Sequence, residues 1–211
     1  TLSVSVKVND GALDSNIVTM TITVTAVNDA PVISGSTASS VDEDQSITLA
    51  LSTVDVSDID NSNDELSLQV LAGDNYTVDG MTVMPAADFN GELMVNVTVS
   101  DGTNTTAVHQ VMVTVNPVND NPVAANDTLT VEENSQSNSI AVMSNDTDVD
   151  GDSLTLDSLV YSGTGAASIQ GESIVYVPAN NFDGTESLTY TISDGNGGTA
   201  TAQLSITVTP R

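Results

Sequence analysis

One six-residue motif, repeated at a fixed distance along the chain, constrains the fold more than any other feature. Val118-Asn119-Asp120-Asn121-Pro122-Val123 has an earlier twin at Val27-Asn28-Asp29-Ala30-Pro31-Val32, and 118 − 27 gives a spacing of 91 residues. Other motifs recur in step. Asp101-Gly102 returns as Asp194-Gly195, 93 residues later. Because internal repeats outrank other signals, the sequence predicts a tandem array. The expected domains are a partial repeat over residues 1–27 and complete repeats over 28–118 and 119–211.

Alternating apolar and polar residues predict that each repeat consists of β-strands. Leu93, Val95, Val97 and Val99 form one inward row, and turn signals such as Asp79-Gly80 separate the apolar segments. In the middle repeat we expect seven strands, near residues 31–41, 46–51, 66–71, 75–78, 81–84, 92–100 and 105–115. Seven short strands per unit are typical of an immunoglobulin-like sandwich. The predicted fold is therefore all-β, with tandem seven-stranded immunoglobulin-like β-sandwiches.

The charge of the chain excludes several kinds of partner. The chain has 2 basic residues, counting Lys and Arg together, and 29 acidic residues, counting Asp and Glu together, which gives a net charge of −27. Nucleic acid and anionic membrane surfaces both require basic patches, so we expect neither as a partner. No apolar run has the length of a membrane helix, so no membrane insertion is predicted. Such a charge could also indicate disorder, but 39% of the residues are hydrophobic and they recur in alternating strands.

The acidic residues are predicted to converge where two repeats meet. Seven strands running up and down place the second-to-third loop and the sixth-to-seventh loop at the end where a repeat begins. The linker enters at that end, and the first turn of the preceding repeat faces the same junction. The candidate ligands at the second junction are Asn119, Asp120, Asn121, Asp146, Asp148, Asp150, Asp152 and Asp194, with Glu43 and Asp44 from the preceding repeat. The first junction is expected to use Asn28, Asp29, Asp58, Asp60 and Asp101.

These side chains point to calcium as the ligand. Clustered carboxylates repel one another, and Lys7 and Arg211 offer too little positive charge to balance them. Hard oxygen ligands on flexible loops, enough for six to eight contacts, suit calcium better than magnesium. Zinc would require His or Cys, and the chain has one His and no Cys. The first junction lacks counterparts of Asp146 and Asp152, so we expect weaker binding or fewer ions there.

Two other interpretations of the acidic loops stay open at this point. Residues 146–152 read D-x-D-x-D-G-x, the opening of an EF-hand loop, but position twelve would be Asp157 and neither flank has a helical pattern. Alternatively, the acidic loops are solvated turns of a salt-adapted protein. A calcium site on β-sheet loops is the favoured interpretation of the three.

The motifs together resemble a known family. Asn119-Asp120-Asn121-Pro122, the pair Asp148 and Asp150, and the turn Glu132-Glu133 are similar to the inter-repeat calcium motifs of cadherins. The whole unit resembles the bacterial cadherin-like, immunoglobulin-like tandem repeats of large secreted calcium-dependent adhesins. The resemblance implies an extracellular or cell-surface location. It also implies a calcium-rigidified spacer or adhesion segment whose partners are calcium ions and neighbouring repeats.

We expect no enzymatic activity from this sequence. His109 is the single histidine, it falls in the inward row of Val111, and it is expected to be a core histidine with its hydrogen bonds satisfied. No Ser or Asp carries a motif that would make it a triad partner. Aromatic residues are only 3% of the chain, whereas sugar-cleaving clefts usually need aromatic platforms. The alternative function is a repeat that itself binds a cell-surface glycan or a partner protein.

Overall fold

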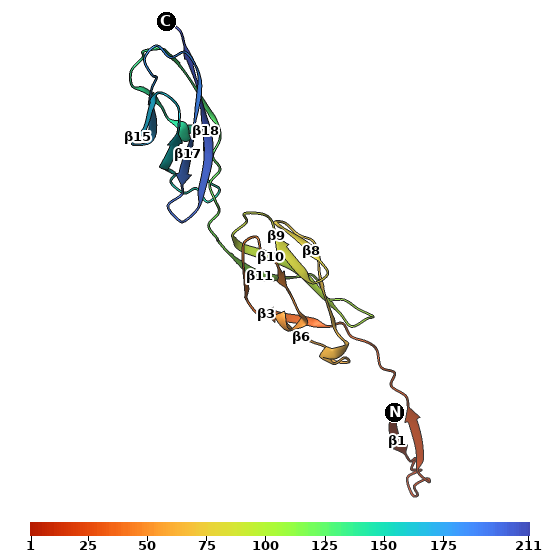
Figure 1. Ribbon diagram of the computed structural model, residues 1–211. Helices are drawn as coiled ribbons and strands as arrows, with labels where there is room; N and C mark the ends of the chain where they lie inside the picture. The colour runs from red at the N-terminus through yellow and green to blue at the C-terminus, as the bar shows by residue number, and fades with distance from the viewer. The chain divides into compact units, whose positions relative to one another are not determined.

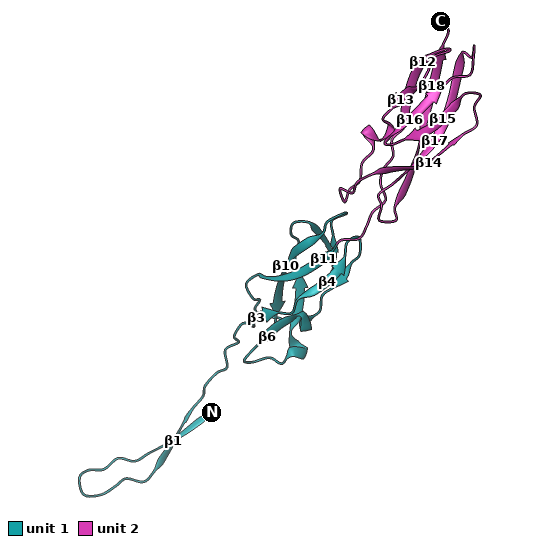
Figure 2. Ribbon diagram, turned by 90° about the vertical axis from the view of Figure 1, so that its left-hand side faces the viewer, with its two compact units in different colours: residues 1–116 teal, residues 117–211 magenta.

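A computed structural model describes residues 1–211, which divide into two compact units, Thr1–Asn116 and Pro117–Arg211 (Figures 1 and 2). Both units are built from β-strands and confirm the predicted all-β fold. The helical segments are three short 3₁₀ turns, η1 (Leu51–Thr53), η2 (Asn63–Glu65) and η3 (Val142–Asn145). No helix combines the length and the apolar character that crossing a bilayer requires.

Unit 1 begins with an antiparallel hairpin of β1 (Leu2–Val6) and β2 (Val18–Ile22). Their register pairs Leu2 with Ile22, Val4 with Met20 and Val6 with Val18, so the apolar residues lie on one face of the hairpin. None of these residues is buried, and Leu2 is 57% exposed.

The remainder of unit 1 is a sandwich. One layer is the sheet β4-β11-β10-β7, and the opposite layer contains the sheets β5-β9-β8 and β3-β6. β4 runs parallel to β11, whereas β10 and β11 form the long antiparallel hairpin. The strands are β3 (Val32–Ser36), β4 (Ser39–Asp42), β5 (Ile47–Thr48), β6 (Val54–Ser57), β7 (Ser67–Val70), β8 (Tyr76–Asp79), β9 (Thr82–Pro85), β10 (Gly91–Ser100) and β11 (His109–Asn116).

The first two expected strands of this sandwich are each broken into two. The segment expected at 31–41 contains β3, which pairs with β6, and then β4, which pairs with β11 in the other layer. β3 also contains a register shift between Ile33 and Gly35, and the change of sheets follows between Ser36 and Ser39. The second strand is interrupted by η1, after which β6 continues to Ser57, beyond the expected end at residue 51. Alternation alone does not show where a strand changes sheets.

The core of unit 1 lies between these layers. Leu93, Val95, Val97 and Val99 are each at most 2% exposed, as predicted for an inward row. His109 pairs with Val97 at the start of β11 and is half-buried. Its Nε2 atom is buried and makes no hydrogen bond, so the expectation of a satisfied core histidine was wrong.

Unit 2 repeats the sandwich, with one sheet of order β12-β18-β17-β14 and another of order β13-β16-β15. The long hairpin is again antiparallel, and Leu188, Tyr190 and Ile192 form its buried inward row. The first strand, β12, runs parallel to β18. The strands are β12 (Asp127–Glu132), β13 (Asn138–Ile140), β14 (Thr155–Tyr161), β15 (Ala166–Gln170), β16 (Ser173–Val177), β17 (Gly184–Ser193) and β18 (Thr199–Thr209).

Candidate metal centre

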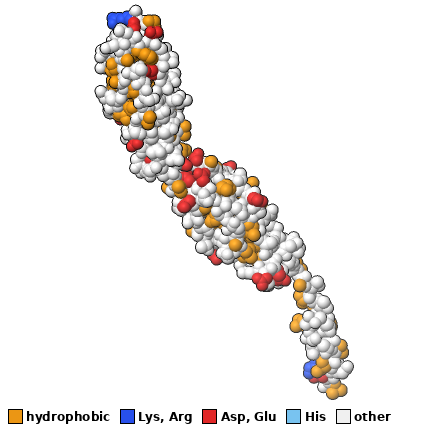
Figure 3. Space-filling view, in the orientation of Figure 1, with side chains coloured by type: hydrophobic (Ala, Val, Ile, Leu, Met, Phe, Trp, Pro, Cys, Tyr) orange, Lys and Arg blue, Asp and Glu red, His pale blue; other side chains and the backbone are white.

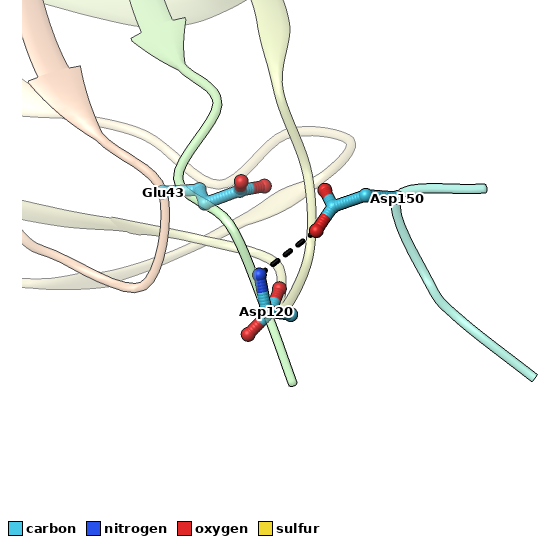
Figure 4. A group of neighbouring side chains, drawn as sticks. All are labelled: Glu43, Asp120 and Asp150. Atoms are coloured by element: carbon cyan, nitrogen blue, oxygen red, sulfur yellow. Dashed lines mark hydrogen bonds between the residues drawn. The ribbon is translucent and has the colours of Figure 1, made fainter. Parts of the chain in front are cut away.

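In unit 2, hydrogen bonds connect the linker motif to two distant loops. The side-chain amide of Asn119 donates to Asp194 Oδ2 at 2.8 Å, and Asp194 lies in the loop between β17 and β18. The backbone N–H of Asp120 donates to Asp150 Oδ2 at 2.8 Å, the contact drawn as a dashed line in Figure 4. Three segments far apart in the sequence therefore meet at the end of unit 2 where the chain enters it.

The loop after β17 is organised around the carboxylate of Asp194, which is 4% exposed. Its Oδ1 atom accepts the backbone N–H groups of Asn196 at 2.7 Å and of Gly197 and Gly198 at 3.0 Å. The hydrogen bond from Asn119 and then these backbone donors lower the pKa of Asp194. Gly198 is required at its position because a Cβ atom there would meet the carboxylate of Asp194 and the side chain of Asn121. Asp194 is therefore held ionised and in place.

The loop 146–152 gathers three further carboxylates. Asp148 Oδ1 accepts the backbone N–H groups of Asp150 at 3.0 Å and Asp152 at 3.2 Å, which folds the loop around this side chain. One oxygen from each of Asp148, Asp150 and Asp152 lies within 4.8 Å of the others. Asp148 Oδ2 is buried and has no hydrogen-bond partner. Since buried acceptors without a donor are costly, this atom fits a cation ligand.

Asp146 has different neighbours from the other acidic residues of its loop. Its Oδ1 accepts the backbone N–H of Ala125 at 2.7 Å and lies 3.4 Å from the hydroxyl of Tyr190. Burial, with a contribution from the negative charge of Asp127, raises the pKa of Asp146. The structure thus places Asp146 against the core, and Asp148, Asp150 and Asp152 together at the loop.

Unit 1 contains the same scaffold at its own linker. Asn28 Nδ2 donates to Asp101 Oδ2 at 2.8 Å, and the backbone N–H of Asp29 donates to Asp60 Oδ2 at 2.9 Å. Asp58 Oδ1 accepts the N–H groups of Asp60 at 2.8 Å and of Asn61 at 2.9 Å. The backbone N–H of Asn104, followed by the amide of Asn28, lowers the pKa of Asp101. All five ligands predicted for the first junction therefore lie in one hydrogen-bonded group.

Asn61 is a candidate ligand that the sequence prediction missed. Its backbone N–H donates to Asp58 Oδ1, just as the backbone N–H of Asp152 donates to Asp148 Oδ1. Its side-chain Oδ1 and Asp58 Oδ2 are both buried without a hydrogen-bond partner. At the repeat spacing of 90 residues, Asn61 corresponds to Gly151 and Ser62 to Asp152, so the loop of unit 1 has no counterpart of the Asp152 carboxylate and carries less negative charge. The signal was available, because Asn61 directly follows Asp58-Ile59-Asp60.

Glu43 and Asp44 lie in unit 1, in the turn that follows β4. Glu43 accepts a hydrogen bond from the amide of Asn90 at 3.3 Å, and Asp44 accepts the backbone N–H of Asp88 at 3.5 Å. The other predicted ligands of the second junction belong to unit 2.

The oxygen atoms of these groups suit a hard divalent cation. Carboxylate and amide oxygens are the usual ligands of calcium, whereas each group lacks the His or Cys ligands typical of zinc. Lys7 and Arg211 are the chain's two basic side chains (Figure 3), and Lys7 forms an ion pair with Asp14 in the first hairpin. The residues present therefore fit calcium. It would supply the positive charge that the protein itself does not.

Comparisons with known proteins agree with this architecture. Residues 27–116 match the family model of the cadherin-like domain, and residues 119–207 match that of the bacterial Ig domain. No curated protein matches the sequence. Domains of these two kinds are typically non-enzymatic, and cadherin-like domains generally bind calcium.

Solved structures show similar folds at low sequence identity. Mouse cadherin-23 repeats EC22-24 are 16% identical, with a TM-score of 0.58, over 96% of this chain and 72% of that one. Human protocadherin-24 repeats EC1-2 are 20% identical, with a TM-score of 0.51, over 87% of this chain and all of that one. An endo-fucoidan hydrolase of glycoside hydrolase family 107 aligns with a TM-score of 0.36, and this chain spans only 34% of its length. The chain is therefore similar to cadherin-like domains over residues 27–116 and to bacterial Ig domains over residues 119–207, and its two units are β-sandwich repeats of these kinds.

Proposed function

We propose that this chain is a calcium-rigidified extracellular spacer or adhesion segment of a large bacterial surface or secreted adhesin. Its repeats, 28–118 and 119–211, would be joined through calcium bound at each linker, and residues 1–27 would be the last hairpin of a preceding repeat. The ligands at the second junction would be the linker residues, the loops of unit 2, and Glu43 and Asp44 of unit 1. Calcium would neutralise carboxylates that otherwise repel one another.

One observation carries this proposal: the same linker-to-loop scaffold is built twice. In both units an Asn of the linker donates to the Asp of the sixth-to-seventh loop at 2.8 Å. In both units the next Asp donates its N–H to the second Asp of a D-x-D loop. In both units the first Asp of that loop keeps one buried oxygen without a partner. A solvated turn would leave these oxygens in water, whereas a buried oxygen without a donor suits a cation ligand.

The strength of calcium binding follows from the location proposed. Extracellular modules of this kind bind calcium with dissociation constants of about 10⁻⁴ to 10⁻³ M. An ion that binds only the folded state stabilises it by about 2.7 kcal/mol at a hundredfold excess over the dissociation constant. The site of unit 1 is expected to bind more weakly than that of unit 2, because it lacks counterparts of the Asp146 and Asp152 carboxylates.

Small-angle scattering and a thermal melt, each with and without a chelator, test the proposal. We expect a stiff particle in calcium that becomes more flexible and melts at a lower temperature after chelation. A chain whose scattering and melting temperature do not respond to calcium would contradict the proposal. The acidic loops would then be solvated turns.

The alternative function, direct binding of a glycan or a protein by one repeat, has less support. An exposed apolar or aromatic patch on a sheet face would favour it. On the outer face of the long hairpin of unit 1, Met94 and Met112 lie opposite each other and are 47% and 37% exposed. Their neighbours Glu92, Asn96 and Gln110 are polar. Two methionines among polar side chains offer little apolar area for a partner.

A further inference from the structure

Asp146 occupies the same place in unit 2 as Val56 does in unit 1. The residue that follows Asp146 is Thr147, which exchanges backbone hydrogen bonds at 2.7 and 3.0 Å with the final Val of its linker motif. The residue that follows Val56 is Ser57, which pairs with the final Val of the earlier motif. Since 147 − 57 gives the 90-residue spacing of the two acidic loops, Asp146 and Val56 are equivalent positions.

These two equivalent residues differ in chemistry, although both lie against the core. Val56 is half-buried and packs against the hydrophobic cluster of unit 1. Asp146 is also half-buried, its Oδ1 accepts the backbone N–H of Ala125 at 2.7 Å, and the hydroxyl of Tyr190 lies 3.4 Å from the same oxygen. A carboxylate therefore occupies in unit 2 a position that unit 1 fills with an apolar side chain.

Tyr190 differs from its own equivalent in the same sense. It lies in the inward row of β17 and corresponds to Val97 in β10, since 190 − 97 gives the 93-residue spacing of the two long hairpins. Both side chains are fully buried. Unit 2 thus has the polar pair Asp146 and Tyr190 where unit 1 has the apolar pair Val56 and Val97. Because a buried polar group needs a partner and an apolar one does not, this joint difference indicates that the two side chains act together.

The hydroxyl of Tyr190 contacts the two segments that lead into the acidic loop of unit 2. It lies 2.8 Å from Ala125 O, in the segment after the linker, and 3.4 Å from Val142 O, in η3 just before the loop. Asp146, which directly follows η3, bonds to the N–H of the same Ala125. The carboxylate and the hydroxyl therefore fix the start of the loop relative to the segment that follows the linker.

Asp146 also lies outside the group of carboxylates that fits a cation. That group consists of Asp148, Asp150 and Asp152, with one oxygen of each within 4.8 Å of the others. Asp148 Oδ2 is buried and has no donor, whereas Asp146 Oδ1 has the N–H of Ala125. The acidic residues of this loop thus divide into one that contacts the core and three that gather around a possible ion.

We infer that Asp146 is a positioning residue and not a calcium ligand: with Tyr190 it fixes the start of the loop whose later carboxylates would hold the ion. Unit 1 fixes the start of its own loop through the apolar packing of Val56. The inference rests on the proposed function as far as calcium is concerned, whereas the contact between Asp146 and Tyr190 does not depend on it.

Terbium luminescence on the full chain tests this inference, because lifetimes in H₂O and D₂O give the number of water molecules on a bound terbium ion. A parent chain with Asp58→Asn and Asp60→Asn removes the candidate site of unit 1 from the signal. In this parent, Asp146→Val should leave the number of waters unchanged and weaken terbium binding by about 10- to 100-fold. Asp150→Ala, which removes a proposed ligand, should add about one water. An added water in Asp146→Val would overturn the inference.

Three further variants separate position from charge. Asp146→Asn keeps an oxygen that accepts the N–H of Ala125, so its affinity should stay within about threefold of the parent. Tyr190→Phe leaves every carboxylate in place and should still weaken binding by about tenfold. Asp157→Val, the same change at an exposed site outside the loop, is the control. An Asp146→Asn variant as weak as Asp146→Val, or a Tyr190→Phe variant as tight as the parent, would overturn the inference, the latter even if Asp146→Val does not fold.

Failure of the proposed function would give a different result. If the unsubstituted chain binds neither calcium nor terbium, the proposed calcium site fails. The anchor formed by Asp146 and Tyr190 is then judged by urea unfolding of Asp146→Asn, Tyr190→Phe and the double variant. Changes to two groups in one contact are non-additive, so a combined shift in midpoint that differs from the sum supports the anchor, and additive shifts overturn it.

Discussion

Asn119 Nδ2 donates a hydrogen bond to Asp194 Oδ2 across 75 residues of sequence, and Asn28 makes the same bond to Asp101 across 73 residues. Each linker is thus fixed to the domain that follows it, at the loop joining the two longest strands. Each linker is therefore part of the folded unit that follows it.

Removing the carboxylates of Asp148, Asp150 and Asp152 should reduce or abolish the calcium response of unit 2. In the triple variant Asp148→Asn, Asp150→Asn and Asp152→Asn, we expect an unchanged or higher melting temperature without calcium, because repulsion is relieved. The calcium-dependent stabilisation, about 2.7 kcal/mol at a hundredfold excess over the dissociation constant, should be reduced or lost. Thermal melts with and without calcium measure both effects. Asp157→Asn, outside the group, is the control, and a triple variant that keeps the full calcium response would contradict the assignment.

Gly198→Ala should weaken calcium binding through the position of Asp194. The added methyl group would meet the Asp194 carboxylate and the Asn121 side chain, so the loop or the linker must shift. Changes next to a ligand of this kind typically cost about 10- to 100-fold in metal affinity, and calorimetric titration measures the loss. Thr105→Ala is the matched control, because residue 105 is the equivalent position in unit 1 and already has a Cβ atom. Equal affinities for the two variants would rule out this role of Gly198.

Glu186→Gln should destabilise unit 2 by about 1–3 kcal/mol. Glu186 lies in the inward row of β17 and accepts hydrogen bonds from Tyr161, from Tyr176 at 2.6 Å, and from the N–H and hydroxyl of Thr164 at 2.7 and 2.8 Å. An amide has one acceptor oxygen and adds two donors, so it cannot satisfy all of these groups. Urea unfolding measures the change. Glu172→Gln, at an exposed site, is the control, and a Glu186 variant as stable as that control would contradict the account.

The Glu186 carboxylate should also make the stability of unit 2 depend on pH. Burial alone would raise the pKa of Glu186, but the bonds from Tyr161, Tyr176 and Thr164 lower it to about 2 from the ordinary 4.5. An acid with a depressed folded-state pKa contributes stability above its unfolded pKa, and that contribution disappears as pH falls through the folded value. The stability difference between the unsubstituted chain and Glu186→Gln should therefore be full above pH 4.5 and vanish near pH 2. Taking the difference cancels the titration of the other carboxylates, and a constant difference over this range would refute the assignment.

Tyr190→Phe should destabilise unit 2 by about 1–3 kcal/mol, because it removes a donor to a charged group. The Tyr190 hydroxyl lies 2.8 Å from Ala125 O and 2.9 Å from Asp127 Oδ2, while its ring is fully buried. Burial and the neighbouring carboxylates, Asp127 first and then Asp146, raise the pKa of this hydroxyl, so it remains a donor at neutral pH. Chemical denaturation measures the loss. In a double-mutant cycle with Asp127→Asn, additive effects would argue against the coupling.

Much of the site could be predicted from the sequence because its framework is periodic. The spacing between Asp29 and Asp120 gives the length of the repeat. The up-and-down order of seven strands predicts which loops lie at the same end, so Asp150 and Asp194 could be placed beside the linker. The remaining details depend on side-chain direction. Asp146 is only two residues from Asp148, yet it turns toward Ala125 and the core. Asn61 was missed because amides were considered only in the linker motif and not in the acidic loop.

The sequence by itself determined the period, the all-β class and the end of each unit at which acidic residues gather, because these follow from local alternation and turn chemistry. Tertiary structure alone decided which oxygens are left without a donor, as at Asp58 and Asp148, and where a strand changes sheets, as between β3 and β4. The reason is physical. Burial and hydrogen-bond partnership at one residue are set by neighbours that lie tens of positions away, as for Asp146 with Ala125 and for Tyr190 with Ala125. No local pattern in the sequence records those contacts.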